Sequence, residues 1–227
     1  MYEYKKKLDR YFKDRYGKEI ITLKPVITFE ESVFSTIKKQ DSERLGWIKG
    51  LPNPLAGVCL WRRDAKIRPV HRFLKQFPKE TTFTNYIGYT FGETRSIVND
   101  DDHNITFEYP LKDIYKMTEQ DCLIYMREKE MENPLYKLFT RTGCGGCQAQ
   151  GDMAWYQVWK HFPDYWKFMK DIEARLQYYI KQGFKVINPY WFEGNRTTQQ
   201  MEFMFKHTSN PMMDFSDEPL KDCFCKI

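Results

Sequence analysis

Residues 152–182, DMAWYQVWKHFPDYWKFMKDIEARLQYYIKQ, form the longest helical segment that the sequence predicts. Aromatic and aliphatic residues recur there at three- and four-residue steps, the spacing that places them on one face of a helix. This spacing favours rings that fill a core over rings that stack on nucleic-acid bases. Pro163 is expected to interrupt or kink the helix, because proline lacks an amide proton. His161 is interpreted as a core histidine rather than a ligand.

The preceding sequence alternates helical and strand-like patterns. An amphipathic helix is expected from the N-terminus to Gly17, followed by the β-rich run KEIITLKPV. Thr28 lies three residues before Glu31, a capping-box spacing that opens a second helix. After a loop rich in glycine and proline, a helix is expected from about Arg68. Two strands (TNYIGYTFGE and NITFEYPL) and a helix from Thr118 complete the series.

This order predicts an α/β fold, an incomplete Rossmann-like sheet with a helical, cysteine-containing C-terminal part. We expect an α/β domain over residues 1–182 and an irregular extension over residues 183–227 that ends in a Cys-x-Cys tail. The chain of 227 residues is large enough for one core with a small appendage.

The composition indicates a folded, soluble protein that does not enter a membrane. No run of about 18 apolar residues occurs, and the N-terminus lacks the apolar region of a signal peptide. A cytoplasmic location, in a bacterial host or a phage-infected cell, is the expectation. The net charge of +5 allows anionic ligands, but without a long basic run it does not favour nucleic acid.

The segment RTGCGGCQAQ (141–150) suggests a metal site. Cys144 and Cys147 have the spacing with which two thiolates bind one metal, and two further ligands are needed for a tetrahedral site. Cys59 and Cys122 are the candidates, giving an all-thiolate zinc or iron–sulfur site. The alternative is that the pair forms a redox disulfide or a plain turn, with Cys122 packed as a small apolar residue.

Two other groups of residues suggest chemistry. Basic side chains gather where the glycine-rich loop enters a helix, and arginine forks there suit a phosphate or sulfate group; the alternative is a solvated basic face. These residues are Arg62, Arg63, Lys66 and Arg68, with Arg95 after a predicted strand. Cys223 and Cys225, beside lysines in the tail, are candidate catalytic thiols or else an exposed pair without a role.

Three stretches together resemble the phosphoadenosine phosphosulfate (PAPS) reductase family of phage and bacteria, within the adenine-nucleotide α-hydrolase superfamily. They are ITFEYPLKDIYKMTEQDCLIYM, NPLYKLFTRTGCGGCQAQ and WKHFPDYWKFMKDIE, in the order and spacing of that family. The resemblance extends loosely over residues 1–180. It implies a Rossmann-like fold, an adenine nucleotide or sulfonucleotide ligand, and a 4Fe-4S cluster held by Cys59, Cys122, Cys144 and Cys147.

The resemblance also implies that Lys66 and Arg141 contact phosphate or sulfate and that the tail carries a catalytic cysteine. The family's Ser-Gly-Gly-x-Asp-Ser nucleotide loop occurs nowhere in the sequence, and the glycine and histidine expected after the tail cysteine are absent. The first hypothesis is therefore an oxidoreductase or sulfur-transferase component that works with a separate loop-bearing N-terminal subunit or as a homo-oligomer. The second is a non-catalytic, metal-stabilised interaction protein, phage-encoded.

Overall fold

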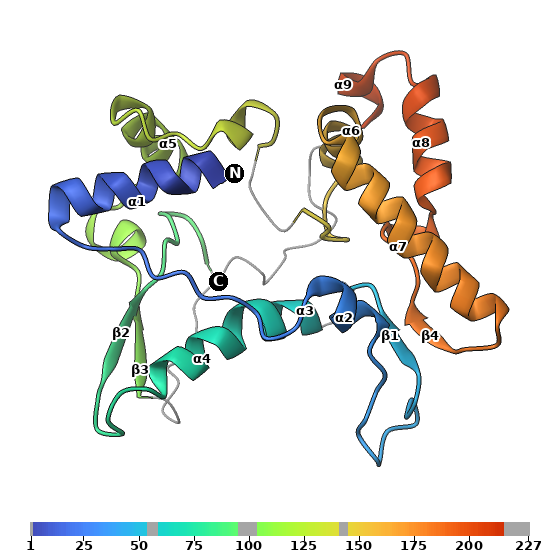
Figure 1. Cartoon of the computed structure of the whole chain (residues 1–227). Helices are drawn as coiled ribbons and strands as arrows, with labels where there is room; N and C mark the ends of the chain where they lie inside the picture. The colour runs from blue at the N-terminus through green and yellow to red at the C-terminus, as the bar shows by residue number, and fades with distance from the viewer. Residues whose placement is uncertain (1, 54–58, 95–103, 141–144, 216–227) are drawn as a thin grey trace. The chain divides into compact units, whose positions relative to one another are not determined.

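The structure is a computed structural model and describes residues 2–53, 59–94, 104–140 and 145–215 (Figure 1). The chain divides into two compact units. Unit 1 comprises Met1–Lys24 and Arg68–Tyr136, and unit 2 comprises Pro25–Ile67 and Lys137–Lys226. Both units combine helices with short parallel strand pairs, so the α/β class is confirmed. The predicted boundary between residues 182 and 183 lies within unit 2.

Unit 2 is organised around helices α6 (Asp152–His161) and α7 (Pro163–Lys181), which form the expected broken helix. Pro163 starts α7 because a first helical position needs no amide donor. The buried face of the two helices carries Trp155, Trp166, Met169 and other apolar residues of the main core. The predicted role of these aromatic residues as core residues is therefore confirmed. His161 is exposed, so its interpretation as a core histidine was wrong.

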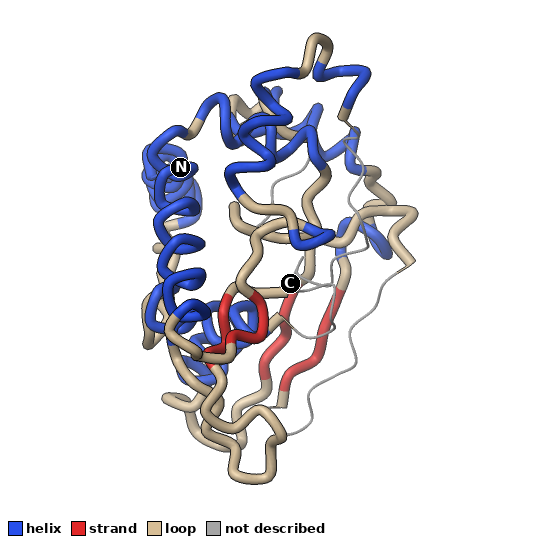
Figure 2. The backbone as a smooth tube through the Cα atoms, turned by 90° about the vertical axis from the view of Figure 1, so that its right-hand side faces the viewer, coloured by secondary structure: helices blue, strands red, loops and turns tan. Residues whose placement is uncertain are grey.

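The strand pair of unit 2 joins β1 (Ile48–Gly50) to β4 (Val186–Asn188) in parallel, as Figure 2 shows in red. Gly50 has a φ of +72°, and a Cβ atom there would lie 2.1 Å from the backbone oxygen of Asn188. Only glycine permits this approach. The strands therefore meet at a position where a side chain has no room.

Residues 183–215 are more regular than the predicted extension. They contain β4, the turn η6 (Glu193–Asn195) and helices α8 (Thr198–His207) and α9 (Pro211–Asp214). Thr197 caps α8 through a capping box with Gln200. Met201 and Phe205 of α8 are almost fully buried, and α8 packs against α7. This burial makes the segment part of the core, which local periodicity did not indicate.

Unit 1 contains the second parallel pair, β2 (Phe83–Tyr86) with β3 (Ile105–Glu108). Its helices are α1 (Tyr2–Tyr16), α4 (Arg68–Leu74) and α5 (Glu119–Glu128), with the π-helical turn η4 (Pro110–Ile114). The tyrosine hydroxyl of Tyr4 in α1 donates to the carbonyl of Met131. Gly17 ends α1 in a left-handed conformation, and α5 begins after Thr118, as the sequence predicts. The structure adds that Thr118 caps α5 through a capping box with Asp121.

Two local predictions differ from the structure. Residues 18–25 form no strand; their side chains are exposed, and no described strand pairs with them. The helix expected from Arg68 follows earlier helical turns, α3 (Leu60–Arg62) and η2 (Arg63–Ile67), in unit 2. Helix α2 (Phe29–Phe34), with its capping box, is confirmed. Among the residues that the structure describes, no helix is long and apolar enough to cross a membrane.

Candidate functional site

Cys59 stands at the N-cap of α3. Its sulfur accepts a hydrogen bond from the backbone amide of Arg62 at 3.4 Å, so the thiol takes the position that serine or threonine often fills. The side chain is half-buried. Sulfur atoms that ligate metals commonly accept such backbone bonds. The position of Cys59 is therefore compatible with a ligand, although the same bond serves a structural cap.

The predicted phosphate-binding residues follow Cys59 on successive turns. Arg63 donates from Nε to Oδ1 of buried Asp64 at 3.0 Å, which commits its fork to a structural ion pair. The Nε atom of Arg62 is buried and has no hydrogen-bond partner in the structure. Lys66 and Arg68 are exposed. The structure thus shows the guanidinium of Arg63 already paired with a charged neighbour.

The second half of the cysteine knuckle is built into the core of unit 2. A Cβ atom on Gly146 would lie 2.6 Å from the indole of Trp191 and 2.8 Å from the hydroxyl of Tyr165. Gln148, next to Cys147, is buried, and its side-chain amide donates to the carbonyl of Phe192 at 3.2 Å. Its Oε1 atom is buried without a hydrogen-bond partner. The glycine is therefore required for packing, whatever the knuckle holds.

A row of three aromatic rings connects these two segments. Trp61, two residues after Cys59, meets Phe29 edge-on with ring centroids 5.2 Å apart. Phe29 stacks on Trp191 at 5.8 Å, and Trp191 borders the knuckle at Gly146. Both cysteine-bearing segments therefore contact one aromatic row inside unit 2. No local pattern in the sequence points to Phe29 and Trp191, because the two residues are far apart in the chain.

The remaining predicted ligands and catalytic residues belong to unit 1 or lie outside the described residues. Cys122 lies on α5 in unit 1. Burial is the main cause that raises the pKa of its thiol, and the negative charges of Asp121 and Glu119 raise this pKa further. Within the described ranges no group of three or more histidine, cysteine or acidic residues could hold a metal ion. The four-cysteine site therefore stays a prediction. Five predicted residues lie outside the described residues: Arg95, Arg141, Cys144, Cys223 and Cys225.

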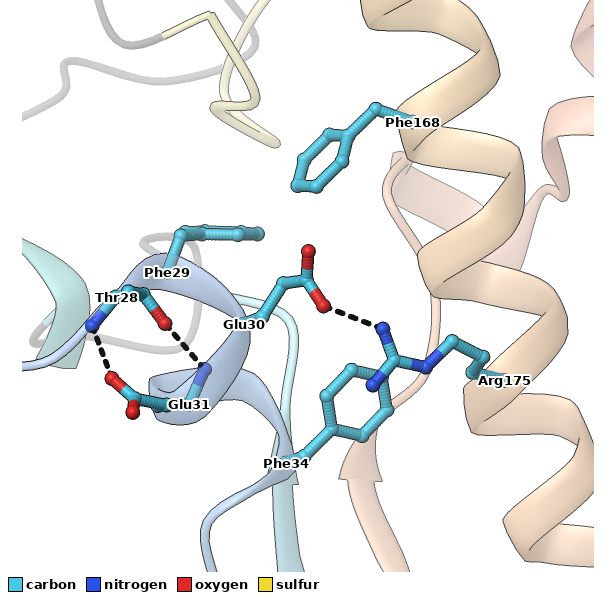
Figure 3. Close-up of a pocket in the computed structure, with 7 residues that line it drawn as sticks. All are labelled: Thr28, Phe29, Glu30, Glu31, Phe34, Phe168 and Arg175. Carbon is cyan, nitrogen blue, oxygen red and sulfur yellow. Dashed lines mark hydrogen bonds and ion pairs between the residues drawn. The ribbon is translucent and has the colours of Figure 1, made fainter.

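A pocket of about 510 Å³ opens between α2 and α7 in unit 2 (Figure 3). Glu30 forms an ion pair of 2.5 Å with Arg175, whose guanidinium lies 4.1 Å from the ring centroid of Phe34. The lining residues are Thr28, Phe29, Glu30, Glu31, Phe34, Phe168 and Arg175. Phe29 thus belongs both to this pocket and to the aromatic row. The sequence signalled only the capping box of Thr28.

Comparisons with known proteins identify no relative. No protein-family profile, no curated protein and no solved structure matches the chain. The candidate function therefore depends on the residues themselves and on the resemblance of their motifs.

Proposed function

We propose that this protein is a metal-containing component of a PAPS-reductase-like system, acting on an activated sulfate or in nucleotide-dependent sulfur transfer. The observation that supports it best is the aromatic row of unit 2. Through Trp61, Phe29 and Trp191 it joins the segment of Cys59 and the basic turns to Gly146, which precedes Cys147. Thiolates and cations on neighbouring segments are what such chemistry requires.

The metal group in this proposal is a 4Fe-4S cluster held by Cys59, Cys122, Cys144 and Cys147. Thiolate ligands suit iron–sulfur clusters and zinc equally, so the donor set fits both. Such a cluster, when bound, supplies charge and redox capacity near the nucleotide site. Cys59 at its helix N-cap and Cys147 beside the packed Gly146 belong to one unit, which supports their part in the set.

The basic side chains take the role of neutralising the anionic substrate. Arg62, Lys66 and Arg68, with Arg95 and Arg141, would offset negative charge on phosphate and sulfonate oxygens as it develops. Arg63 belongs to this set as well, and its guanidinium pairs with Asp64. A thiolate of Cys223 or Cys225 would attack the sulfonyl sulfur and break its bond to the bridging oxygen, so that the nucleotide phosphate leaves. A thiol reductant would then release sulfite from the S-sulfonated cysteine.

A further chain or segment is expected to complete the nucleotide site. The sequence contains no Ser-Gly-Gly-x-Asp-Ser loop, so the backbone amides that cradle a pyrophosphate would come from elsewhere. Both described parallel sheets have only two strands, whereas parallel sheets normally have more strands and both faces covered. Additional strands from a loop-bearing subunit or a second copy would make a Rossmann-like sheet that binds an adenine nucleotide.

Metal analysis of anaerobically purified protein tests the proposal. We expect a brown protein with about four irons per chain, lost in Cys59→Ser and in Cys147→Ser. The matched control is Cys223→Ser with Cys225→Ser, which should keep the iron and abolish sulfonate reduction in the presence of the loop-bearing partner. Stoichiometric zinc without colour would favour a structural site, and protein without any metal would refute the proposal.

The second candidate function is a non-catalytic, metal-stabilised interaction protein, phage-encoded and acting on a host complex. The missing phosphate loop favours it, since a chain without the loop has no means of its own to hold a pyrophosphate. Equilibrium dialysis with ATP, with and without a loop-bearing partner, separates the two functions. Absence of nucleotide binding in both mixtures would support the interaction protein. Steeply salt-dependent retention of DNA or RNA would instead indicate nucleic-acid binding, the least favoured function.

A further inference from the structure

The pocket between α2 and α7 combines aromatic rings with a carboxylate. The ring centroids of Phe29 and Phe168 are 6.1 Å apart, and the ring planes are inclined at 54°. The rings therefore form a V rather than a parallel pair. Figure 3 shows the carboxylate of Glu30 beside the two rings. Both phenylalanines are half-buried, and both line the pocket.

One oxygen of Glu30 remains available to a ligand. Its Oε2 atom accepts the ion pair from Arg175, whereas its other oxygen, directed toward Phe168 in Figure 3, has no partner among the described residues. Glu31 adds a second negative charge and is held by the capping box of Thr28. Glu30, Glu31 and Arg175 together give the pocket lining a net charge of −1. Only the carboxylate of Glu30 meets the guanidinium, whereas that of Glu31 is directed toward Thr28 (Figure 3).

Arg175 shows that this lining accommodates an organic cation. Its guanidinium lies 4.1 Å from the ring centroid of Phe34 and pairs with the carboxylate of Glu30 at the same time. A cation over an aromatic ring is attracted by the negative ring face, and a carboxylate beside it adds a charged hydrogen-bond acceptor. The same combination of aromatic rings and a carboxylate oxygen occurs at Phe29, Phe168 and the second oxygen of Glu30. There, no cation of the described residues occupies it.

A flat aromatic ligand fits this V less well than a compact cation. Insertion of a base between two rings needs about 7 Å, twice the contact distance of roughly 3.5 Å. The separation of 6.1 Å and the 54° inclination exclude that sandwich without movement of a helix. A lysine or arginine end group needs no such gap, because it can lie against an exposed ring face beside the carboxylate, as Arg175 does at Phe34 and Glu30.

We propose that this pocket binds a lysine or arginine side chain presented by a basic peptide segment of a partner protein. The volume of about 510 Å³ is large enough for the side chain and its flanking backbone. The proposal is independent of the metal and of the sulfur chemistry, because it rests only on the pocket between α2 and α7.

The test is a titration of the full-length protein, followed by aromatic ¹H–¹³C NMR. The probe is a capped pentapeptide with one central lysine between glycines, alongside its arginine counterpart. The matched control peptide has norleucine, which keeps the aliphatic chain and lacks the charge. We expect the lysine or arginine peptide to shift the Phe29 and Phe168 resonances and to bind at least about threefold more tightly than the norleucine peptide. Equal binding of all three would overturn the proposal.

Variants of the pocket separate recognition of the cation from a loss of structure. Phe168→Leu and Glu30→Gln should each weaken lysine-peptide binding about threefold to fivefold, whereas Glu43→Gln on an exposed loop should not. Arg175→Gln should tighten binding, because it removes a competing cation and releases the first carboxylate oxygen.

The folded state of each variant is verified by circular dichroism and thermal melting. Unchanged or weaker binding in folded Arg175→Gln would contradict the proposal. So would a dimer of the unliganded protein that Glu30→Gln dissociates, since the occupant would then be a second copy of this chain.

Discussion

Replacing Glu173 with glutamine should change how the stability of the protein depends on pH. Glu173 lies on α7 with 6% of its surface exposed, and both of its carboxylate oxygens accept from the backbone amide of Thr198, at 3.1 and 3.0 Å. Burial raises the pKa of this carboxyl from 4.5 to about 7, a shift that the hydrogen bonds from Thr198 oppose. The folded protein therefore holds the Glu173 proton more tightly than the unfolded chain does.

The direction and the size of the effect follow from this difference. The stabilisation is fully present below pH 4.5 and is lost as the pH rises to about 7. Each pH unit of pKa difference corresponds to about 1.4 kcal/mol, so the change approaches roughly 3 kcal/mol in the free energy of unfolding. Glutamine is neutral at every pH and keeps an oxygen that accepts from the amide of Thr198. The Glu173→Gln variant should therefore lack this loss.

Urea unfolding, monitored by tryptophan fluorescence at several pH values between 4.5 and 8, measures the effect. The variant should match the wild type near pH 5 and exceed its stability at pH 8. Glu43→Gln, on an exposed loop, is the control for the loss of one charge. The carboxyl of Glu202 does not titrate in this pH range, because its pKa is lowered to about 2. The main cause is the hydrogen bond from Lys206. An identical pH dependence in wild type and Glu173→Gln would refute the reasoning.

Two further substitutions test close packing against backbone and side chains. Gly146→Ala should destabilise unit 2 by about 1–3 kcal/mol in thermal or urea unfolding, because its Cβ would lie 2.6 Å from an indole ring. The control Gly145→Ala should reduce the stability clearly less, since the nearest neighbour of its Cβ would be 3.4 Å away. Gly50→Ala should be more damaging still, since its Cβ would lie 2.1 Å from a backbone oxygen of β4 and its φ of +72° disfavours a side chain. Soluble yield and melting temperature measure the effect of both substitutions. Wild-type stability in either variant would contradict the close contact on which its prediction depends.

Local sequence patterns predicted the helices more successfully than the strands. The end of α1 at Gly17, the capping box of Thr28, the helix start at Thr118 and the break at Pro163 are all present as expected. Each depends on residues within one or two helical turns of each other. The run KEIITLKPV has strand-forming residues but no described partner strand, and β propensity alone did not make it a strand.

The candidate sites show the same division. Cys59 and the basic residues after it were recognisable as types of residue, but only the structure places Cys59 at a helix N-cap and pairs Arg63 with Asp64. Cys122 belongs to the other unit, so its relation to the knuckle is decided neither by spacing nor by the described contacts. The pocket at Glu30 was not foreseen, since its two walls are more than a hundred residues apart in the chain.

The sequence alone determined the α/β class, the positions of the capped helices and the types of residue available for chemistry, because these depend on short-range periodicity and side-chain identity. Tertiary structure alone decided that β1 pairs with β4, that Phe29 stacks on Trp191, and that Glu173 is buried beneath the start of α8. These contacts join segments distant in the chain, and their free energy comes from packing and desolvation that no local pattern encodes.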